Sequence, residues 1–326
     1  MILFRLWRRI FARKRHTALI YNPECMAHDM GPENPETPER LTAIMQAFAQ
    51  SKLSEYVGQT SSAKATEQQI ARVHPPSYLN YLESITPNTG IVTINADMAI
   101  GQHSLNAAQF AAGAVVKAVD MVMSAEVFNA FCAIRPPGHH AHSKKSVGFC
   151  FLNNVAIGAM HALNEHRLKR VAIVDFDAHH GDGTEEIVQN DSRIMFLSVF
   201  QHPFFPFNDE ESLKEHHTNP NIILSPLAAN SGSFELRKTI ARQWLPRLKA
   251  FKPELIIISA GFDGHKDDEM SHLNFVEADY KWMTEKLMRI ADLYGKGRMV
   301  SVLEGGYNVS SLSRSVIAHL EALTSS

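Results

Sequence analysis

Aspartates and histidines gather directly after a short apolar run in the stretch VAIVDFDAHHGDGTEE, residues 171–186. The apolar run has the pattern of a strand that is buried on both faces. Asp177 and His179 are two positions apart, so in an extended backbone they point the same way and can share one ion. Buried carboxylates and imidazoles are costly unless something compensates them, and a metal ion does so. The spacing therefore predicts a metal site rather than an acidic loop that stays in water.

Asp263 is the candidate for a third ligand, because it follows another apolar run of strand type. Two carboxylates and one imidazole suit zinc with an activated water, and iron(II) or cobalt could occupy the same set. Zinc between two aspartates is formally neutral, so activation of the water needs a base. The tandem histidines His139 and His140 could supply it, with Asp175 and Asp182 available to hold the second imidazole nitrogen.

Tyr307 follows the pair Gly305-Gly306, which allows the backbone to approach the site closely. A phenol in this place can donate a hydrogen bond to a developing oxyanion. Metal, base and oxyanion donor together predict hydrolysis of a carbonyl compound, most simply an amide. His180 has no assigned role in this chemistry, and a structural role is open to it. The single histidines that are expected at the surface are His16, His103, His161, His216, His217 and His319.

The elements that must position these residues alternate between strands and helices. Such alternation predicts a mainly parallel sheet with helices on both faces, in a single α/β domain. In such a sheet ligands bind beyond the carboxyl ends of the strands, which is where the reactive residues follow their apolar runs. Strands are expected at Thr17–Tyr21, Phe128–Ile134, Val171–Val174, Ile194–Val199, Ile222–Leu224, Leu255–Ala260 and Met299–Leu303. Helices are expected at Leu41–Ser51, Glu67–Glu83 with a break at Pro75 and Pro76, Leu105–Ser124, Asn153–Glu165, Phe234–Phe251, Glu277–Tyr294 and Leu312–Leu323, and a loop at Thr86–His103.

The overall composition narrows the functional class. The chain has 326 residues and a formal net charge of -2, which gives no reason to expect direct nucleic-acid binding. Residues 1–16 form a basic amphipathic segment that could touch a membrane surface, trail as a tail or pack on the body, and residues 17–326 form one domain. No apolar run is long enough to span a bilayer. Cys25, Cys132 and Cys150 form no disulfide framework, which fits a reducing compartment and predicts a cytoplasmic location.

Several motifs at the predicted sheet edge resemble those of a known family. IRPPGHHA (134–141), GFCFLNN (148–154), VDFDAHHGDGT (174–184), SAGFD (259–263) and LEGGYN (303–308) are together similar to the zinc-dependent histone deacetylase family and its bacterial relatives, which include acetylpolyamine amidohydrolases. ENPETPERLTAI (33–44) resembles the N-terminal signature of that family. The resemblance covers nearly the whole chain beyond residues 1–16 and implies the arginase-like α/β fold.

The resemblance also implies a role for each reactive residue. His140 is implied as general base and acid, oriented by Asp182, and His139 as its electrostatic partner, paired with Asp175. Tyr307 is similar to the tyrosine that polarises the scissile carbonyl and stabilises the tetrahedral intermediate. The implied ligands of a single zinc ion are Asp177, His179 and Asp263. The implied ligands of a structural potassium ion are Asp175, Asp177, His179, Ser198 and Val199.

Substrate contacts follow from the same resemblance. Phe149 and Phe205, with Gly148 beside them, would wall a narrow tunnel for the methylene stem of an acyl-lysine. Asp97 sits where the family often has an acid that grips the substrate backbone, and Met270 sits where polyamine-selective relatives place an acidic gatekeeper. The apolar Met270 favours an uncharged stem. Residues 207–221 and the SGSFE run depart from the family pattern, and a further expected contact is Gly306.

Three other functions compete with deacylation of N-acyl-lysine by zinc-activated water. A binuclear manganese ureohydrolase of arginase type shares the DAH run, but Gly261 stands where its bridging acid should be. A catalytically silent binding module would have lost Tyr307 or a metal ligand, and none is lost. An amidohydrolase acting on acetylpolyamines or other small amides would use every catalytic residue named above, so it stays open as the alternative.

Overall fold

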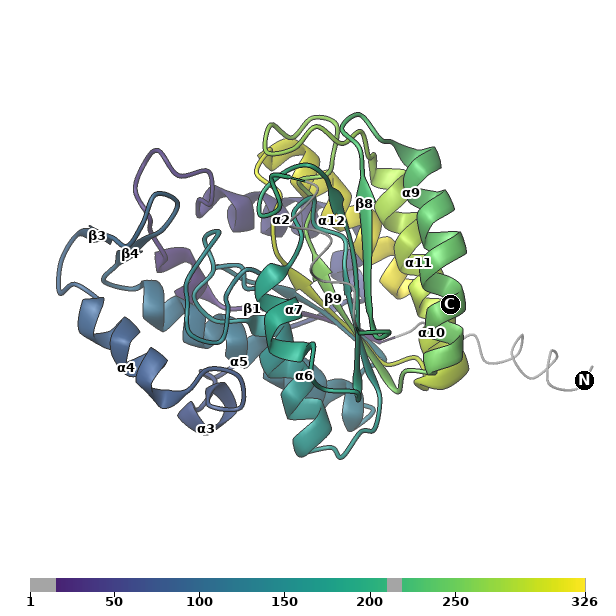
Figure 1. The fold of residues 1–326 in the computed structure, drawn as a ribbon, viewed down its shortest axis with the longest axis horizontal. Helices are drawn as coiled ribbons and strands as arrows, with labels where there is room; N and C mark the ends of the chain where they lie inside the picture. The colour runs from purple at the N-terminus through teal and green to yellow at the C-terminus, as the bar shows by residue number, and fades with distance from the viewer. Residues whose placement is uncertain (1–15, 210–218, 326) are drawn as a thin grey trace, which may run out of the picture.

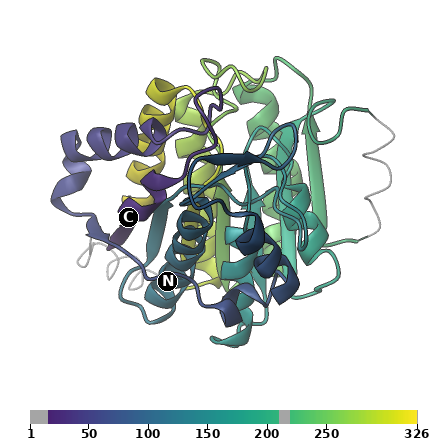
Figure 2. The ribbon, with the colours of Figure 1, turned by 90° about the vertical axis from the view of Figure 1, so that its left-hand side faces the viewer.

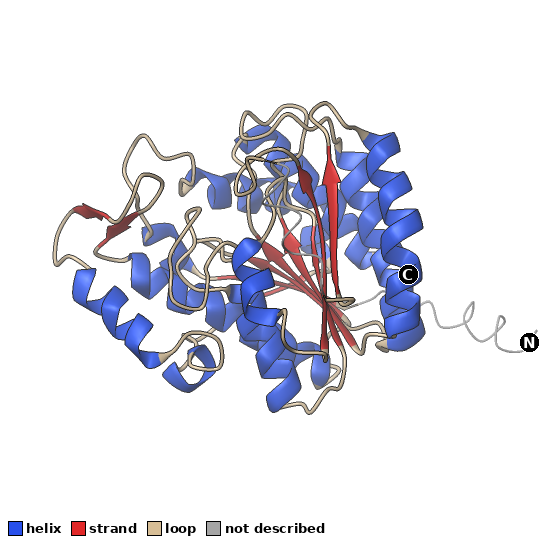
Figure 3. Ribbon diagram, in the orientation of Figure 1, coloured by secondary structure: helices blue, strands red, loops and turns tan. Residues whose placement is uncertain are grey.

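The computed structural model describes residues 16–209 and 219–325. Within these residues eight strands form one sheet in the order β2-β1-β5-β10-β9-β6-β7-β8, and every pairing in it is parallel. Helices lie on both faces of the sheet (Figures 1 and 3), so the predicted α/β fold is confirmed. The strands are β1 (Thr17–Tyr21), β2 (Gly58–Thr60), β5 (Asn129–Ala133), β6 (Val171–Asp175), β7 (Ile194–Gln201), β8 (Ile222–Leu227), β9 (Leu255–Ala260) and β10 (Met299–Leu303).

Two layers of helices cover this sheet. On one face α5 (Ser104–Met123) packs against β5, and α6 (Asn154–Asn164) packs against β6 and β9. On the other face α11 (Glu277–Tyr294) packs against α12 (Val309–Thr324), which in turn contacts α2 (Glu39–Gln50) (Figure 1). The remaining elements are η1 (Pro23–Ala27), η2 (Lys52–Glu55), α3 (Glu67–Ile70), α4 (Pro76–Ile85), β3 (Ile91–Thr93), β4 (Ala99–Gly101), α7 (Asp182–Val188), α9 (Ser233–Thr239), the π-helical η3 (Ile240–Trp244) and α10 (Leu245–Phe251).

The core lies between the sheet and these layers. All residues of β6 and β9 are buried, as expected of central parallel strands whose two faces are both covered. Small residues let α6 approach α5 closely, because a Cβ added to Gly158 would lie 2.5 Å from Cγ1 of Val115. On its other side α6 contacts β6, and the loop after β6 carries two of the predicted metal ligands.

The prediction of a loop at Thr86–His103 is wrong, because the segment contains an antiparallel pair of strands, β3 and β4. Each strand is three residues long, which is too short to show a hydrophobic period in the sequence. The pair lies on the side that Figure 2 turns toward the viewer, near α4 in Figure 1. The predicted break between two helical pieces is confirmed, because α3 ends at Ile70 and α4 begins at Pro76.

Two histidines expected at the surface are buried. His319 is 0% exposed, and its ring bonds to Ser301 Oγ at 2.8 Å and Thr284 Oγ1 at 2.6 Å. His161 is 4% exposed and bonds to Asp120. The prediction failed because an amphipathic helix can bury a histidine on its inner face when polar partners satisfy both nitrogens. His16 and His103 are exposed as expected, and His216 and His217 lie outside the described residues.

The predictions on the termini and cysteines have mixed outcomes. Cys25, Cys132 and Cys150 are buried free thiols, as the apolar runs around Cys132 and Cys150 indicated. Residues 1–15 of the basic segment lie outside the described residues, so membrane contact there stays a prediction. In residues 16–209 and 219–325 no helix combines the length and apolar character that crossing a bilayer requires.

Candidate active site

Three predicted metal ligands converge at the carboxyl ends of β6 and β9. His179 Nδ1 lies 3.1 Å from Asp177 Oδ1 and 2.9 Å from Asp263 Oδ2, and one ligand atom from each residue lies within 4.8 Å of the others. Asp177 and His179 come from the loop after β6, and Asp263 comes from the loop after β9. The three residues are at most 8% exposed, so water offers them little compensation.

The two carboxylates of this triad have opposite pKa shifts. Burial and the nearby charge of Asp177 raise the pKa of Asp263. Burial opposes ionisation of Asp177 as well, but the His139 and His179 rings outweigh it and lower the pKa of Asp177. Two carboxylates at this separation disfavour each other's charge. A divalent cation between them removes that repulsion and accepts the imidazole lone pair, so the donor set fits a metal ion such as zinc.

Glycines and backbone amides hold the triad in place. Gly305 N donates to Asp177 Oδ2 at 2.8 Å, and Ala178 N donates to Asp263 Oδ1 at 2.9 Å. A Cβ added to Gly261 would lie 1.9 Å from Asp177 Oδ2. A carboxylate ligand therefore has no room at position 261, which argues against the binuclear ureohydrolase.

Two histidine–aspartate pairs stand beside the triad. His139 Nδ1 lies 2.9 Å from Asp175 Oδ2, and His140 Nδ1 lies 2.7 Å from Asp182 Oδ1. The two imidazole centroids are 4.0 Å apart. Asp175 ends β6 and Asp182 begins α7, so these two elements hold both histidines of the loop after β5.

The environment divides the two imidazoles into a charged and a neutral one. Burial disfavours the cation of His139, but Asp175 and Asp177 outweigh it and raise the pKa of His139 well above its ordinary value. Burial and the charge of His139 lower the pKa of His140 to about 4, even though Asp182 opposes the shift. At neutral pH His139 is therefore a cation and His140 is a free base.

Tyr307 lies above the site on the loop after β10. Its ring is 5.9 Å from the Phe149 ring, centre to centre, and the Arg40 guanidinium carbon is 4.9 Å from its centroid. Gly306 has φ +118°, a conformation that favours glycine, and its carbonyl accepts from Arg40 Nε at 2.6 Å. Burial raises the pKa of the Tyr307 phenol well above its ordinary value, so the phenol keeps its proton.

A cavity of about 720 Å³ leads to these groups. Predicted substrate residues that line it are Asp97, Gly148, Phe149, Phe205 and Met270, together with the reactive residues His140, His179 and Tyr307. Phe205 packs on the His140 ring with centroids 5.0 Å apart, and Phe204 stacks on the His179 ring at 5.4 Å. The cavity is thus an aromatic passage that reaches His179 of the triad and His140 of the second histidine–aspartate pair.

The comparisons with known proteins agree with this arrangement. Residues 34–323 match the model of the histone deacetylase domain. This chain belongs to the histone deacetylase family. The match makes the chain a hydrolase of the deacetylase type.

The similarity to relatives and to a solved structure covers nearly the whole chain. The chain is 36% identical to an uncharacterized protein of Synechocystis over 94% of its own length and 99% of that protein. It is 35% identical to a probable deacetylase of Archaeoglobus fulgidus over 90% of this chain and 82% of that protein. A crystal structure of the HDA15 HD domain superposes with a TM-score of 0.88 at 28% identity, covering 95% of this chain and 90% of that chain.

Several residues of this deacetylase-type site were not found from the sequence. Glu304 is fully buried, and its Oε2 accepts from Gly138 N at 2.6 Å and His139 N at 3.2 Å. His142 Nε2 lies 3.0 Å from Asp182 Oδ2, so Asp182 serves two histidines. Glu304 directly follows the apolar run of β10, the same signal that drew attention to Asp175 and Asp177, and His142 lies two positions beyond His140.

A buried ion cluster behind Tyr307 was missed as well. Glu36 bonds to Arg135 at 2.5 and 2.7 Å and to Arg40 at 2.8 Å. Arg40 Nη2 also donates to the Glu304 carbonyl at 2.5 Å. The cluster ties the loops after β5 and β10 to the start of α2. The signal available in the sequence was the charged residues inside two motifs, Glu36 and Arg40 in ENPETPER and Arg135 in IRPPGHHA.

The apolar Met270 alone predicted an uncharged substrate stem, but charged side chains line the same cavity. Glu269 is exposed and lines the same cavity as its neighbour Met270. Asp97 Oδ2 accepts from Gly148 N at 2.8 Å, so this acid already holds the tunnel wall. Lys145 also lines the mouth. The entrance therefore carries charge of both signs around an apolar passage.

Three of the five residues implied for a potassium ion, Asp175, Ser198 and Val199, lie on the neighbouring strands β6 and β7, and the other two lie in the loop after β6. Asp175 of β6 pairs in register with Ser198 of β7. His180, which had no assigned role, bonds through Nδ1 to Ser198 Oγ at 2.9 Å and through Nε2 to Glu185 Oε2 at 2.7 Å. His180 is thus a structural link between β7 and α7. The potassium ion itself stays a prediction.

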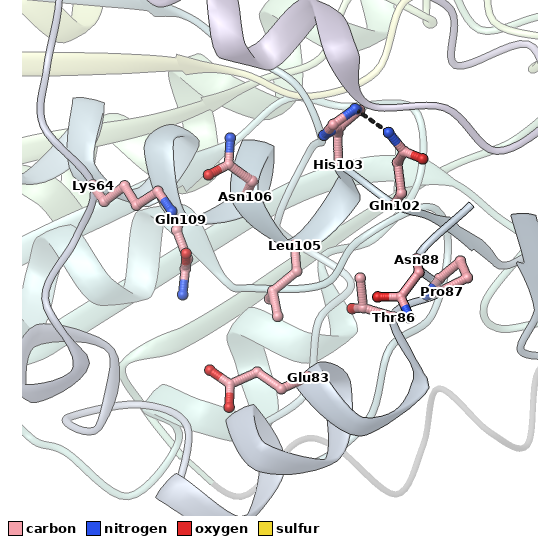
Figure 4. A pocket seen from close by; sticks show the side chains of 10 residues that line it. All are labelled: Lys64, Glu83, Thr86, Pro87, Asn88, Gln102, His103, Leu105, Asn106 and Gln109. Carbon is pink, nitrogen blue, oxygen red and sulfur yellow. Dashed lines mark hydrogen bonds between the residues drawn. The ribbon is translucent and has the colours of Figure 1, made fainter. Parts of the chain in front are cut away.

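A second, polar hollow of about 440 Å³ lies between α4 and α5 (Figure 4). Its lining includes Glu83, Gln102, His103 and Gln109, and His103 bonds to Gln102 at 2.6 Å. None of the predicted site residues is in its lining. Four of its ten lining residues carry side-chain amides, and its one carboxylate, Glu83, has no second carboxylate beside it in the lining, so the predicted chemistry belongs to the aromatic cavity.

Proposed function

We propose that this chain is a zinc-dependent amidohydrolase that removes acetyl or other acyl groups from N-acyl-lysine side chains. One observation carries the proposal. His179 of the carboxylate–imidazole triad, the neutral His140 and the protonated Tyr307 phenol line one aromatic cavity. This set matches the demands of amide hydrolysis, which needs an activated water, a proton acceptor and a donor for the oxyanion.

Zinc is the ion proposed for Asp177, His179 and Asp263 because two oxygens and one nitrogen leave positions open for water and substrate. When bound, it would lower the pKa of a water molecule and polarise the substrate carbonyl. Potassium beside Asp175 and Ser198 is a separate, structural proposal that comes from the family resemblance, and these two residues are register partners on β6 and β7.

His140 is the proposed proton acceptor. Its Nδ1 is held by Asp182, so Nε2 is left to take the proton of the attacking water and later to return it to the leaving amine. Its lowered pKa keeps it in the base form at neutral pH. His139, held by Asp175 and positively charged, would stabilise negative charge that develops beside it.

Tyr307 is the proposed oxyanion donor. Its raised pKa means that the phenol keeps its proton to donate to the developing oxyanion. Arg40 holds the preceding carbonyl of Gly306 and lies against the phenol ring, so the loop that carries the donor is fixed before substrate arrives. Phe149 and Phe205 would exclude water from the passage and pack on the methylene stem of the substrate.

A second candidate, an acetylpolyamine or other small N-acyl amine, is favoured by one observation. Glu269 presents an exposed carboxylate at the cavity rim, where a distal ammonium group would meet it. Its neighbour Met270 favours an apolar stem instead. Substrate preference therefore depends on which of the two side chains faces the bound molecule.

A substrate panel tests both candidates. Acetyl-lysine peptides, longer acyl-lysine peptides and acetylpolyamines would be compared with and without a zinc chelator, using Asp263→Ala as the inactive variant. Asp267→Ala is the matched control, because Asp267 lies on the same loop but is exposed and pairs with Arg314 at 3.0 Å. We expect hydrolysis of acyl-lysine that needs metal, is lost in Asp263→Ala and survives in Asp267→Ala. Full activity in Asp263→Ala or under chelation would refute the mechanism.

A further inference from the structure

A second set of metal-ligating side chains lies on α5, on α6 and in the turn that follows α6. His161 Nε2 lies 2.8 Å from Asp120 Oδ1, and His166 Nε2 lies 2.7 Å from the same oxygen. One ligand atom from each residue lies within 4.8 Å of the others, as in the triad of Asp177, His179 and Asp263. The cluster shares no residue with the aromatic cavity.

The backbone brings these three side chains together before any ion binds. Asp120 is in the last turn of α5, and His161 is in the last turn of α6. The chain reverses after α6 through Arg167, whose φ is +55° although it is not glycine. The reversal sets the His166 ring edge-on to the His161 ring, with centroids 5.5 Å apart. Both imidazoles thus point Nε2 at the Asp120 carboxylate.

The chemistry of the cluster suits a borderline-soft divalent ion. Two neutral imidazoles and one carboxylate are ligands that zinc, cobalt, nickel and copper accept, with the remaining positions filled by water. The site is open to solvent, because the Asp120 side chain is 52% exposed and that of His166 is 25% exposed. We propose that Asp120, His161 and His166 form a second divalent transition-metal site, separate from the catalytic one.

Arg72 competes with the ion for His161. Its Nη1 donates to His161 Nδ1 at 3.1 Å, which places the proton of the neutral ring on Nε2, facing Asp120. An ion bound at Nε2 moves that proton to Nδ1, so Arg72 must then turn away. It can do so because its Nη2 already bonds to the exposed Glu165. The site is therefore a weak one whose affinity Arg72 controls.

A bound ion would fasten α5 to the turn that leads into β6. The other end of α6 reaches the active site, where Asn153 Nδ2 donates to the Ala141 carbonyl at 3.1 Å in the loop that carries His139 and His140. An ion that binds the folded chain alone stabilises it by mass action. The expected consequence is a higher melting temperature in the presence of zinc rather than a change in the chemical step.

Metal stoichiometry tests the proposal on protein whose catalytic site is already loaded. Wild type, Asp120→Asn and His166→Gln would be dialysed against zinc chloride and analysed for metal per chain, with a thermal melt of each. His103→Gln is the matched control, because it removes an exposed histidine outside the cluster. We expect wild type and His103→Gln to hold one zinc more than the other two variants and to melt at a higher temperature with zinc.

Two further variants separate this site from the catalytic one and test the ligand assignment. Asp263→Ala is expected to lose the catalytic ion and keep the second, so failure of the proposed function leaves this inference standing. Arg72→Gln is expected to bind the second ion more tightly, and unchanged or weaker binding would contradict His161 Nε2 as a ligand. Equal zinc content in wild type, Asp120→Asn and His166→Gln would overturn the site altogether.

Discussion

Histidines bond to aspartates in two regions of this molecule, the active site and the cluster of Asp120, His161 and His166. The aspartates of the two regions differ in how far water reaches them. At the carboxyl end of β6 the carboxylates of Asp175 and Asp177 are at most 1% exposed. Near the amino end of β6 the carboxylate of Asp120 is half exposed. Burial strips water from a charged group and leaves protein neighbours to set its protonation, whereas an exposed pair is screened and contributes little. In the active site, burial therefore fixes which side chains are charged. The Asp120 cluster is a polar contact between α5 and the end of α6.

The largest contrast is expected when one histidine is removed from each region. His140→Ala removes the proposed base, so kcat should fall by about 10²–10⁴-fold, the usual contribution of general acid–base catalysis. His166→Ala should leave kcat unchanged. The measurement is the steady-state kcat of both variants on the same acyl-lysine peptide. Equal losses would mean that the two regions are coupled and that the comparison is wrong.

A smaller loss is expected when the phenol above the buried region is removed. Tyr307→Phe keeps the ring packing against Phe149 but deletes the oxyanion donor, so kcat should fall by about 10²–10³-fold while KM changes little. Tyr81→Phe is the control, because Tyr81 is an exposed tyrosine at 48%. An increase in KM with unchanged kcat would instead assign Tyr307 to substrate binding.

The next smaller difference in activity is expected when the aspartate that bonds to two histidines is changed in each region. Asp182→Asn weakens the bonds that hold His140 and His142, and supporting groups of this kind typically contribute about 10- to 100-fold in activity. Asp120→Asn is expected to have no effect on activity, because neither Asp120 nor the two histidines bonded to it lines the cavity. Circular dichroism of both variants checks the fold. A full rate in Asp182→Asn would show that packing alone orients His140.

The smallest expected effect is a displaced acid limb of the pH profile. The pKa of His140 lies at about 4, so this imidazole is a free base at neutral pH and gains a proton only as the pH falls through that value. The decline of kcat/KM assigned to His140 should therefore lie below the ordinary histidine range near 6.5. Asp182→Asn removes a charge that opposes the shift and should move the limb lower. A limb that moves upward in this variant would contradict the assignment.

The metal triad and the catalytic pairs could be predicted because they stand in short motifs directly after strands. In a parallel sheet the carboxyl ends of the strands share one edge, so Asp177, His179 and Asp263 were expected to meet, and they do. The burial of His161 and His319 could not be predicted in this way. Their partners Asp120, Ser301 and Thr284 lie 18 to 41 positions away in sequence and become neighbours only through packing.

The sequence by itself determined which chemical groups this protein carries to the sheet edge and which family it belongs to. Residue identity and spacing along a strand set the direction of each side chain locally. Only the tertiary structure decided that Arg40 supports the loop of Tyr307, that Glu269 joins Met270 at the rim and that His139 and His140 differ in charge. These features depend on distances between elements far apart in the chain and on the burial those elements impose, and neither is encoded in any single motif.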